Sequence, residues 1–234
     1  MSQSPEAPAG DLGSSAGRRR QRYGELLGAI LLVFAIQGIA EPAWWEEVLV
    51  TVLLGVTLLL ALWAAEARPG VLRVALGVVV AVVLLSFLEA LSGNVDQAST
   101  RLANALLVAL APVAVVVGVV RNLRARQTVT LEAVLGVLCI YILLGMFYGF
   151  IYGSIARIGG EPFFAGEQPA TVAHCLYFSF ITLTTVGYGD FTASGNLGHT
   201  LSASEALTGQ IYLVTIVSLI VANLGQRRPV SRSQ

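Results

Sequence analysis

Residues 171–190 read TVAHCLYFSFITLTTVGYGD, and this stretch decides the fold. Its first part, 171–184, is an apolar run of 14 residues. Such a run is too short to cross a ~30 Å hydrocarbon layer and too apolar to lie in water. Pro169 precedes the run, and a segment with Gly187 and Gly189 follows it. The pattern predicts a re-entrant half-helix that enters a membrane and stops, followed by an irregular loop at membrane depth.

The composition of the whole chain also indicates a membrane setting. Of 234 residues, 56% are hydrophobic and 12% are charged, and the mean hydropathy is +0.76. Soluble domains carry about twice that share of charge. With 14 basic and 14 acidic residues there is no basic excess to bind nucleic acid. Cys139 and Cys175 lie far apart in apolar runs and predict neither a disulfide framework nor a metal site.

Charge-free apolar runs predict six transmembrane helices, so the expected fold class is an all-α membrane protein. The runs lie at 26–40, 48–65, 74–88, 102–120, 133–156 and 206–226. The third run is short, but it extends to about 71–92 if Arg73 snorkels and Glu89 lies near the far edge. Residues 1–22 are rich in Ser, Gly, Ala and Pro and predict a disordered cytoplasmic tail that ends in arginines.

Two interpretations of the first run remain open. Arginines before it and the small residues 38–40 after it are typical of a cleaved signal peptide. Trp44 and Trp45 instead fit a retained helix that leaves the membrane, because indole rings settle at the headgroup level. Either outcome leaves the topology of the later runs unchanged.

Arginine positions predict the orientation. With the N-terminus inside, twelve arginines are cytoplasmic and only Arg101 and Arg157 are external. The twelve are Arg18, Arg19, Arg20, Arg22, Arg68, Arg73, Arg121, Arg124, Arg126, Arg227, Arg228 and Arg232. We therefore expect a multi-pass protein of the cell membrane with both termini cytoplasmic. The segment from about 153 to 205, which contains the half-helix and loop, then lies on the outer side.

The loop after the half-helix has the residues needed to bind a dehydrated cation. A cation that enters lipid loses hydration worth tens of kcal/mol unless other oxygens replace it. Consecutive backbone carbonyls can do so if all of them point to one axis, and Gly187 and Gly189 can adopt the positive φ that this requires. Thr185 adds a hydroxyl oxygen, and the half-helix directs its partially negative C-terminus toward the inner end of the loop.

The sequence TTVGYGD at 184–190 resembles the selectivity filter of the potassium channel pore family. The resemblance covers about 130 to 224 and is densest from Tyr177 to Asp190. It implies that four carbonyls and the threonine hydroxyl ligate K⁺ as the permeant ion, with no other cofactor. These ligands come from a filter of Thr185, Val186, Gly187, Tyr188 and Gly189.

The resemblance also implies roles around the filter. Asp190 matches the acidic residue of the outer mouth. Tyr177, Phe178 and Thr184 are expected to support the filter, and Tyr188 is expected to point away from the axis and brace it against pore-helix aromatics. Some family members carry a Glu four residues before the filter threonine. This chain has Ile181 there, so a carboxylate pair behind the filter is not available.

The last run reads as one long inner helix from 197 to 224. Gly209 stands where family inner helices have a hinge glycine, but a small residue that allows close helix packing is an equally good interpretation. Gln210 and Thr215 either line a cavity or bond across helices. Glu205 is either a structural hydrogen-bond partner or a proton-sensitive site.

One filter strand cannot encircle an ion, so we expect a homotetramer about a shared axis. The expected domains are residues 23–126, a four-helix membrane domain, residues 127–225, the pore domain, and 226–234, a short cytoplasmic tail. The run 102–120 carries no charge, so no arginine-based voltage sensor is predicted.

Two alternative functions remain at this stage. A weakly selective cation channel would share the architecture, whereas a secondary cation transporter usually shows repeats and broken helices in both halves. An enzyme is not expected, because no nucleophile–base or metal-ligand spacing is present.

Overall fold

The protein is described by a computed structural model, which covers residues 10–39, 44–65, 67–92, 106–111, 113–114, 131–158, 162–166 and 168–218. Over these residues it is all-α. The helices are α1 (Gly10–Ile39), α2 (Trp44–Ala64), α3 (Pro69–Ser92), α5 (Leu131–Ile158), α6 (Val172–Leu183) and α7 (Gly195–Tyr212), which continues as a π-helix, η1 (Leu213–Val217). Residues 106–111 and 113–114 are also helical.

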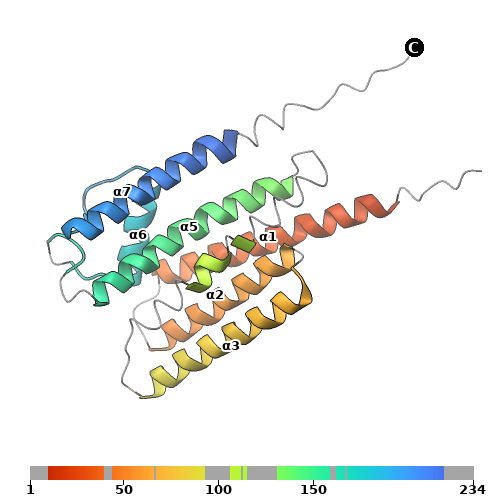
Figure 1. The fold of residues 1–234 in the computed structure, drawn as a ribbon, viewed down its shortest axis with the longest axis horizontal. Helices are drawn as coiled ribbons and strands as arrows, with labels where there is room; N and C mark the ends of the chain where they lie inside the picture. The colour runs from red at the N-terminus through yellow and green to blue at the C-terminus, as the bar shows by residue number, and fades with distance from the viewer. Residues whose placement is uncertain are drawn as a thin grey trace, which may run out of the picture.

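Most of the long helices lie side by side, with α3 at one flank and α7 at the other (Figure 1). The short helix α6 lies at one end of the molecule and contacts α5, α7 and α1. α1 also packs on α2 and α5, and α2 packs on α3. Through these contacts the first helix touches the segment that the sequence singled out.

Small residues set the close packing of α5 on α6. A Cβ on Gly145 would lie 2.7 Å from the Phe180 ring, and one on Gly149 would lie 2.8 Å from the Leu176 side chain. The two glycines are one turn apart, so they form a shallow groove on α5 that admits the larger side chains of α6. The close position of α6 therefore depends on the two glycines of α5, which have no side chains to hold it away.

Two of the described helices are long and apolar enough to cross a membrane, Pro69–Leu88 and Val134–Ile158, whereas Val48–Ala64 is shorter. Only 11% of the α3 window is buried, so most of its apolar side chains face outward. Outward-facing Val and Leu are what lipid contact requires. The prediction that the third run extends to 71–92 agrees with the bounds of α3.

Some predicted boundaries were wrong or lie outside the described residues. α1 begins at Gly10, so residues 10–22 are helical and not the expected disordered tail. Extending an existing helix costs far less free energy than nucleating a new one. α1 therefore extends from its apolar half toward the N-terminus. Residues 1–9, most of the run 102–120, the boundary at 126–127 and residues 219–234 lie outside the described part.

Candidate functional site

α6 is the predicted half-helix, and both of its ends are capped. At the start, Thr171 Oγ1 accepts a hydrogen bond from the backbone N–H of His174 at 3.1 Å, which is a typical N-cap. At the end, the Thr184 hydroxyl donates to the carbonyl of Phe180 at 2.6 Å. The helix therefore spans 12 residues, and Thr184 is its C-cap, while its support of the filter stays a prediction.

The backbone after α6 alternates in handedness. φ is +58° at Thr185, +52° at Gly187 and +80° at Gly189, whereas Val186 and Tyr188 keep negative φ. Among the described residues, Thr185 is the only non-glycine with positive φ, a conformation that costs roughly 1–2 kcal/mol. The glycines were predicted from the sequence, but the strained threonine was not. Strain of this kind is typical of functional segments.

The N–H groups of this segment are directed back to α6. Thr185 N donates to Thr182 O at 2.9 Å, and the N–H groups of Val186 and Gly187 both donate to Ile181 O, at 2.9 and 3.0 Å. These bonds satisfy carbonyls that every helix leaves open at its C-terminus. They also tie the path of the loop to the last turn of α6. Among the described residues, no backbone N–H donates to the carbonyls of 185–188.

The outer end of the loop is joined to α6 by a tyrosine–carboxylate bond. The Tyr177 hydroxyl donates to Asp190 Oδ2 at 2.7 Å, and Asp190 Oδ1 accepts the N–H of Phe191 at 3.0 Å. The hydrogen bond to Asp190 raises the pKa of the Tyr177 phenol above its ordinary value of 10.0. Tyr177 and Asp190, predicted separately as filter support and outer mouth, are therefore brought together.

Phe178 lies in a buried aromatic cluster that the sequence did not predict as a unit. Its ring contacts those of Tyr152, Phe163 and Phe164 at centroid distances of 5.2, 6.1 and 5.4 Å. Phe164 in turn contacts Phe191, just beyond the filter, at 5.1 Å. The cluster connects α5, the loop at 162–166, α6 and the segment after the filter. The only signal in the sequence was the density of aromatic residues from 147 to 191.

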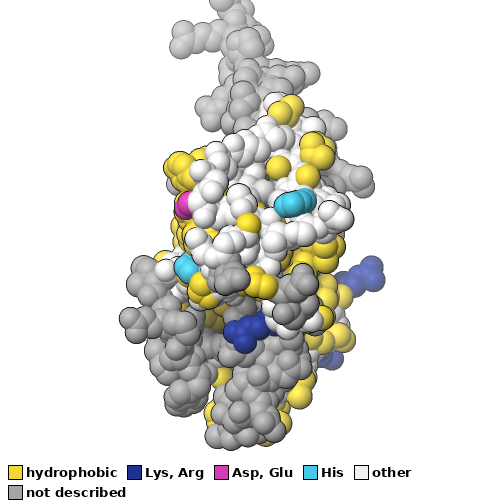
Figure 2. All heavy atoms as spheres, turned by 90° about the vertical axis from the view of Figure 1, so that its left-hand side faces the viewer, with side chains coloured by type: hydrophobic (Ala, Val, Ile, Leu, Met, Phe, Trp, Pro, Cys, Tyr) yellow, Lys and Arg dark blue, Asp and Glu magenta, His cyan; other side chains and the backbone are white. Residues whose placement is uncertain are grey.

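The loop at 162–166 is also hydrogen-bonded to the chain that leaves the filter. Ala165 N donates to Thr192 O at 2.9 Å, and Ser194 N donates to Phe163 O at 2.7 Å. His199 Nε2 lies 2.9 Å from Ala193 O in the same region. Backbone and uncharged polar atoms make up much of this end of the molecule, with His side chains and one small acidic patch at its surface (Figure 2).

The inner end of the loop is joined to α7. Gln210 Nε2 donates to Thr185 Oγ1 at 2.9 Å. A hydroxyl oxygen has two lone pairs, so the second remains available to another partner. Gly209 is buried, and a Cβ there would overlap the carbonyl oxygen of Leu183. Gly209 is thus a close-packing residue in this structure, while the hinge interpretation stays a prediction. Thr215 bonds back to Ile211 O at 2.5 Å.

Two side chains of the loop after α6 are largely exposed in the single chain. Val186 is 52% exposed and Tyr188 is 72% exposed, and the bracing role of Tyr188 stays a prediction. Behind the loop lies a cavity of about 370 Å³ bordered by Phe178, Thr182 and Gly187, among others.

A buried carboxyl group on α7 contacts both α5 and α6. Glu205 Oε2 accepts from the Tyr152 hydroxyl at 2.5 Å, and Glu205 Oε1 lies 2.5 Å from Ser179 Oγ. The sequence predicted Glu205 as a possible hydrogen-bond partner, but Ser179 and Tyr152 were missed. The available signal was a lone serine in the apolar run 171–184. No group of three His, Cys, Asp or Glu side chains among the described residues could hold a metal ion.

Comparison with known proteins finds a similarity in the last part of the chain. Residues 136–226 match the family model described as an ion channel. The match contains most of α5, together with α6, the loop after it and α7, which are the elements that build the site above. The matched domain is that of an ion channel and not of an enzyme. No solved structure matches the chain.

Proposed function

Given an ion channel domain over residues 136–226, we propose that four copies of this chain form a potassium-selective channel. The observation that carries the proposal is the alternating backbone of Thr185, Gly187 and Gly189 within TVGYG. Alternating handedness turns successive carbonyls to one side of the chain, whereas a regular strand alternates them. The carbonyls of Thr185, Val186, Gly187 and Tyr188 would then replace the hydration shell of K⁺.

The hydrogen bonding of the loop supports the same function. Its N–H groups donate to the last turn of α6, so positive backbone dipole ends are directed away from a passing cation. Asp190 places a carboxylate at the outer end of the filter, and Thr185 places a hydroxyl at the inner end. Gln210, at the inner end of the filter, would face a water-filled cavity while it holds that hydroxyl.

The exposed filter side chains support a homotetramer. A single strand provides ligands on one side only, and four strands about an axis surround the ion with equivalent oxygens. Tyr188 of one copy would enter the cavity of about 370 Å³ beside Thr182 of the next copy, where the hydroxyl of Thr182 could bond the phenol. Assembly would thereby bury the aromatic side chain that the single chain leaves exposed.

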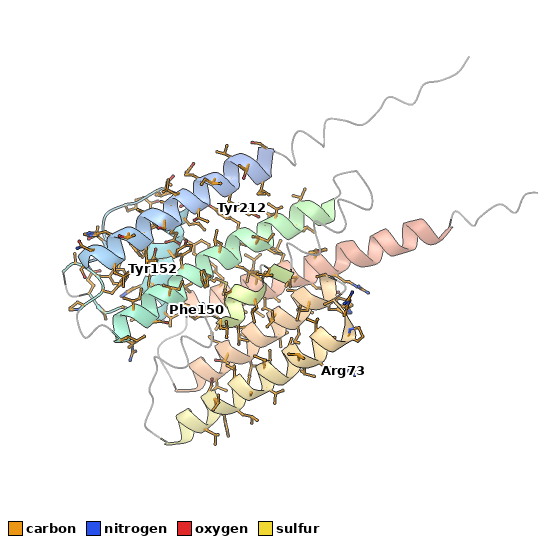
Figure 3. The ribbon with its side chains drawn as sticks, viewed as in Figure 1. Arg73, Phe150, Tyr152 and Tyr212 are labelled. Carbon is orange, nitrogen blue, oxygen red and sulfur yellow. The ribbon has the colours of Figure 1, made fainter. Side chains whose placement is uncertain are left out.

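The proposed topology has six membrane-spanning helices and places both termini in the cytoplasm. Arg73 lies at the end of the bundle opposite Tyr152 (Figure 3). At this proposed cytoplasmic end, Arg22 of α1 stacks over Trp63 of α2 at 4.0 Å. Arginines gathered at the end away from the filter agree with the positive-inside rule.

Rubidium uptake by liposomes that contain the pure protein tests this function. We expect uptake driven by a potassium gradient and crosslinked products up to the tetramer. Uptake of sodium at the same rate would favour a weakly selective cation channel, and flux that is saturable and stoichiometrically coupled would favour a transporter. Absence of uptake, or crosslinking that stops at a dimer, would refute the proposal.

A further inference from the structure

One carboxyl group lies at the junction of three helices of the channel domain. Glu205 is fully buried, and the buried residues of α7 are otherwise two glycines, Gly198 and Gly209. The buried positions of α7 are therefore two small residues and one carboxyl. A buried carboxyl has to be hydrogen-bonded, since leaving it unpaired costs several kcal/mol.

The partners of Glu205 come from the two other helices of the junction. Oε2 lies 2.5 Å from the Tyr152 hydroxyl of α5, and Oε1 lies 2.5 Å from Ser179 Oγ of α6. Ser179 Oγ also lies 2.6 Å from the carbonyl oxygen of Gly145 on α5. Figure 3 labels Tyr152 at the end of α5 that lies against α6 and α7. The result is a chain of three contacts that joins all three helices.

The number of available hydrogens shows whether the neutral or the ionised carboxyl fits these three contacts. Three contacts need three hydrogens, but Tyr152 and Ser179 supply one each, and the Gly145 carbonyl can only accept. An ionised Glu205 would leave one contact without a hydrogen. A neutral Glu205 donates to Ser179, Ser179 then donates to Gly145, and Tyr152 donates to Glu205. Every contact is satisfied only in this form.

The surroundings contain no charge that would stabilise the ionised form. The titratable groups that face Glu205 from α5 are the phenols of Tyr152 and, more distant, Tyr141. α6 presents the Ser179 hydroxyl, with the buried Cys175 thiol in the adjoining aromatic cluster. The other titratable side chains of α7, His199 and Tyr212, contact the carbonyls of Ala193 and Val137 instead. Among the described residues no cation lies against the carboxyl.

The junction is linked directly to the filter. Ser179 is two residues before Ile181, whose carbonyl accepts the N–H groups of Val186 and Gly187. A shift of α6 away from α7 would therefore move the backbone that orients the proposed ion ligands. Holding α6 in place at Ser179 holds the filter in place as well.

We infer that Glu205 is a positioning residue, held as the neutral carboxylic acid, which fixes the pore helix α6 and through it the filter. The inference rests on the proposed channel function. Alkaline pH would ionise Glu205, remove the hydrogen that it donates to Ser179 and leave a charge buried between helices. Conduction should then fall roughly tenfold from neutral to alkaline pH, the effect of losing one buried hydrogen bond.

The test measures rubidium uptake from weakly acidic to alkaline pH with the full chain in liposomes. Glu205→Gln keeps the shape, accepts from Tyr152 and donates to Ser179 at every pH, so it should conduct at neutral pH and show no alkaline loss. Glu205→Ala and Ser179→Ala should conduct poorly at all pH values. Ser154→Ala is the matched control, because Ser154 is a buried serine whose hydroxyl donates to the Phe150 carbonyl of its own helix. It should retain the wild-type pH profile.

Infrared spectroscopy separates this inference from the proposed function. The wild-type protein should show a protonated-carboxyl C=O band at neutral pH that is lost at alkaline pH and is missing in Glu205→Gln. Rubidium uptake that falls equally in wild type and Glu205→Gln would overturn the inference. So would a Glu205→Gln tetramer that does not conduct. If the wild type passes no rubidium, the channel proposal fails, and the presence or absence of the band decides the protonation state of Glu205 on its own.

Discussion

At the residue scale, the filter depends on glycines that adopt positive φ without strain. Substituting Gly187→Ala should cost about 1–2 kcal/mol in backbone energy, although a Cβ there has no atom within 4 Å. The strain would be relieved by rotating the peptide and removing a carbonyl from the ion path. We expect rubidium uptake to be lost while the tetramer persists on size-exclusion chromatography.

Gly166→Ala is the control for that substitution. Gly166 has φ of +88° and equally open space around its Cβ position, but it lies in the loop before α6. Gly166→Ala should lower the stability of the protein about as much as Gly187→Ala does and leave rubidium uptake unchanged. Equal loss of uptake in the two variants would mean that backbone strain anywhere in the domain stops conduction, and that the filter geometry is not special.

A second prediction at this scale concerns the bond between Tyr177 and Asp190. If this bond holds the outer end of the filter, Tyr177→Phe and Asp190→Asn should each lower the melting temperature of the tetramer. The double variant should lower it no further than the more severe single variant. Tyr148→Phe, which changes a tyrosine on α5, should combine additively with Asp190→Asn. Additive losses from Tyr177→Phe and Asp190→Asn would show that the two groups act independently.

At the element scale, the close approach of α7 to the end of α6 requires a small residue. A Cβ on Gly209 would overlap the Leu183 carbonyl, so Gly209→Ala should destabilise the protein by about 1–3 kcal/mol in thermal unfolding. Gly77→Ala on α3 is the comparison, because its Cβ position has no atom within 4 Å and alanine favours helix by about 0.5–1 kcal/mol. A Gly209→Ala protein as stable as wild type would show that α7 can move away from α6, as a hinge would allow.

The elements of the pore were largely predictable from the sequence because their signals are local. A short apolar run after Pro169 predicts α6, and glycine spacing predicts two of the three positive φ values after it. The positive φ of Thr185 was not predictable, because hydrogen bonds from the loop to α6 impose it. The link of Glu205 to Tyr152 and Ser179 joins residues that are 53 and 26 positions apart, and no local pattern encodes such contacts.

At the scale of the whole molecule, the packing of the first helices on the channel domain was not predicted from the sequence. α1 contacts the pore helix, with Phe34 and Phe180 rings 4.8 Å apart at 60°. The sequence placed residues 23–126 in a separate domain with no recognised motif, and hydropathy alone does not reveal which helices touch. The apolar run did predict a helix over about 71–92, and most of the apolar side chains of α3 face outward.

The distribution of arginines leads to a prediction about gating. The run 102–120 carries no charge, and a charge is worth about 2.3 kcal/mol per 100 mV only if it moves through the field. We therefore expect Arg101→Gln and Arg121→Gln to leave the voltage dependence of the current unchanged in bilayer recordings. A shift of steep, voltage-dependent opening in either variant would show that these arginines sense the field.

Selectivity for potassium is the central claim, and a reversal potential measures it most directly. Purified protein in a planar bilayer, with potassium on one side and sodium on the other, should give single-channel currents that reverse strongly toward the equilibrium potential of potassium. Currents that reverse near zero would mean that the two ions pass alike, and the account of the filter would be contradicted.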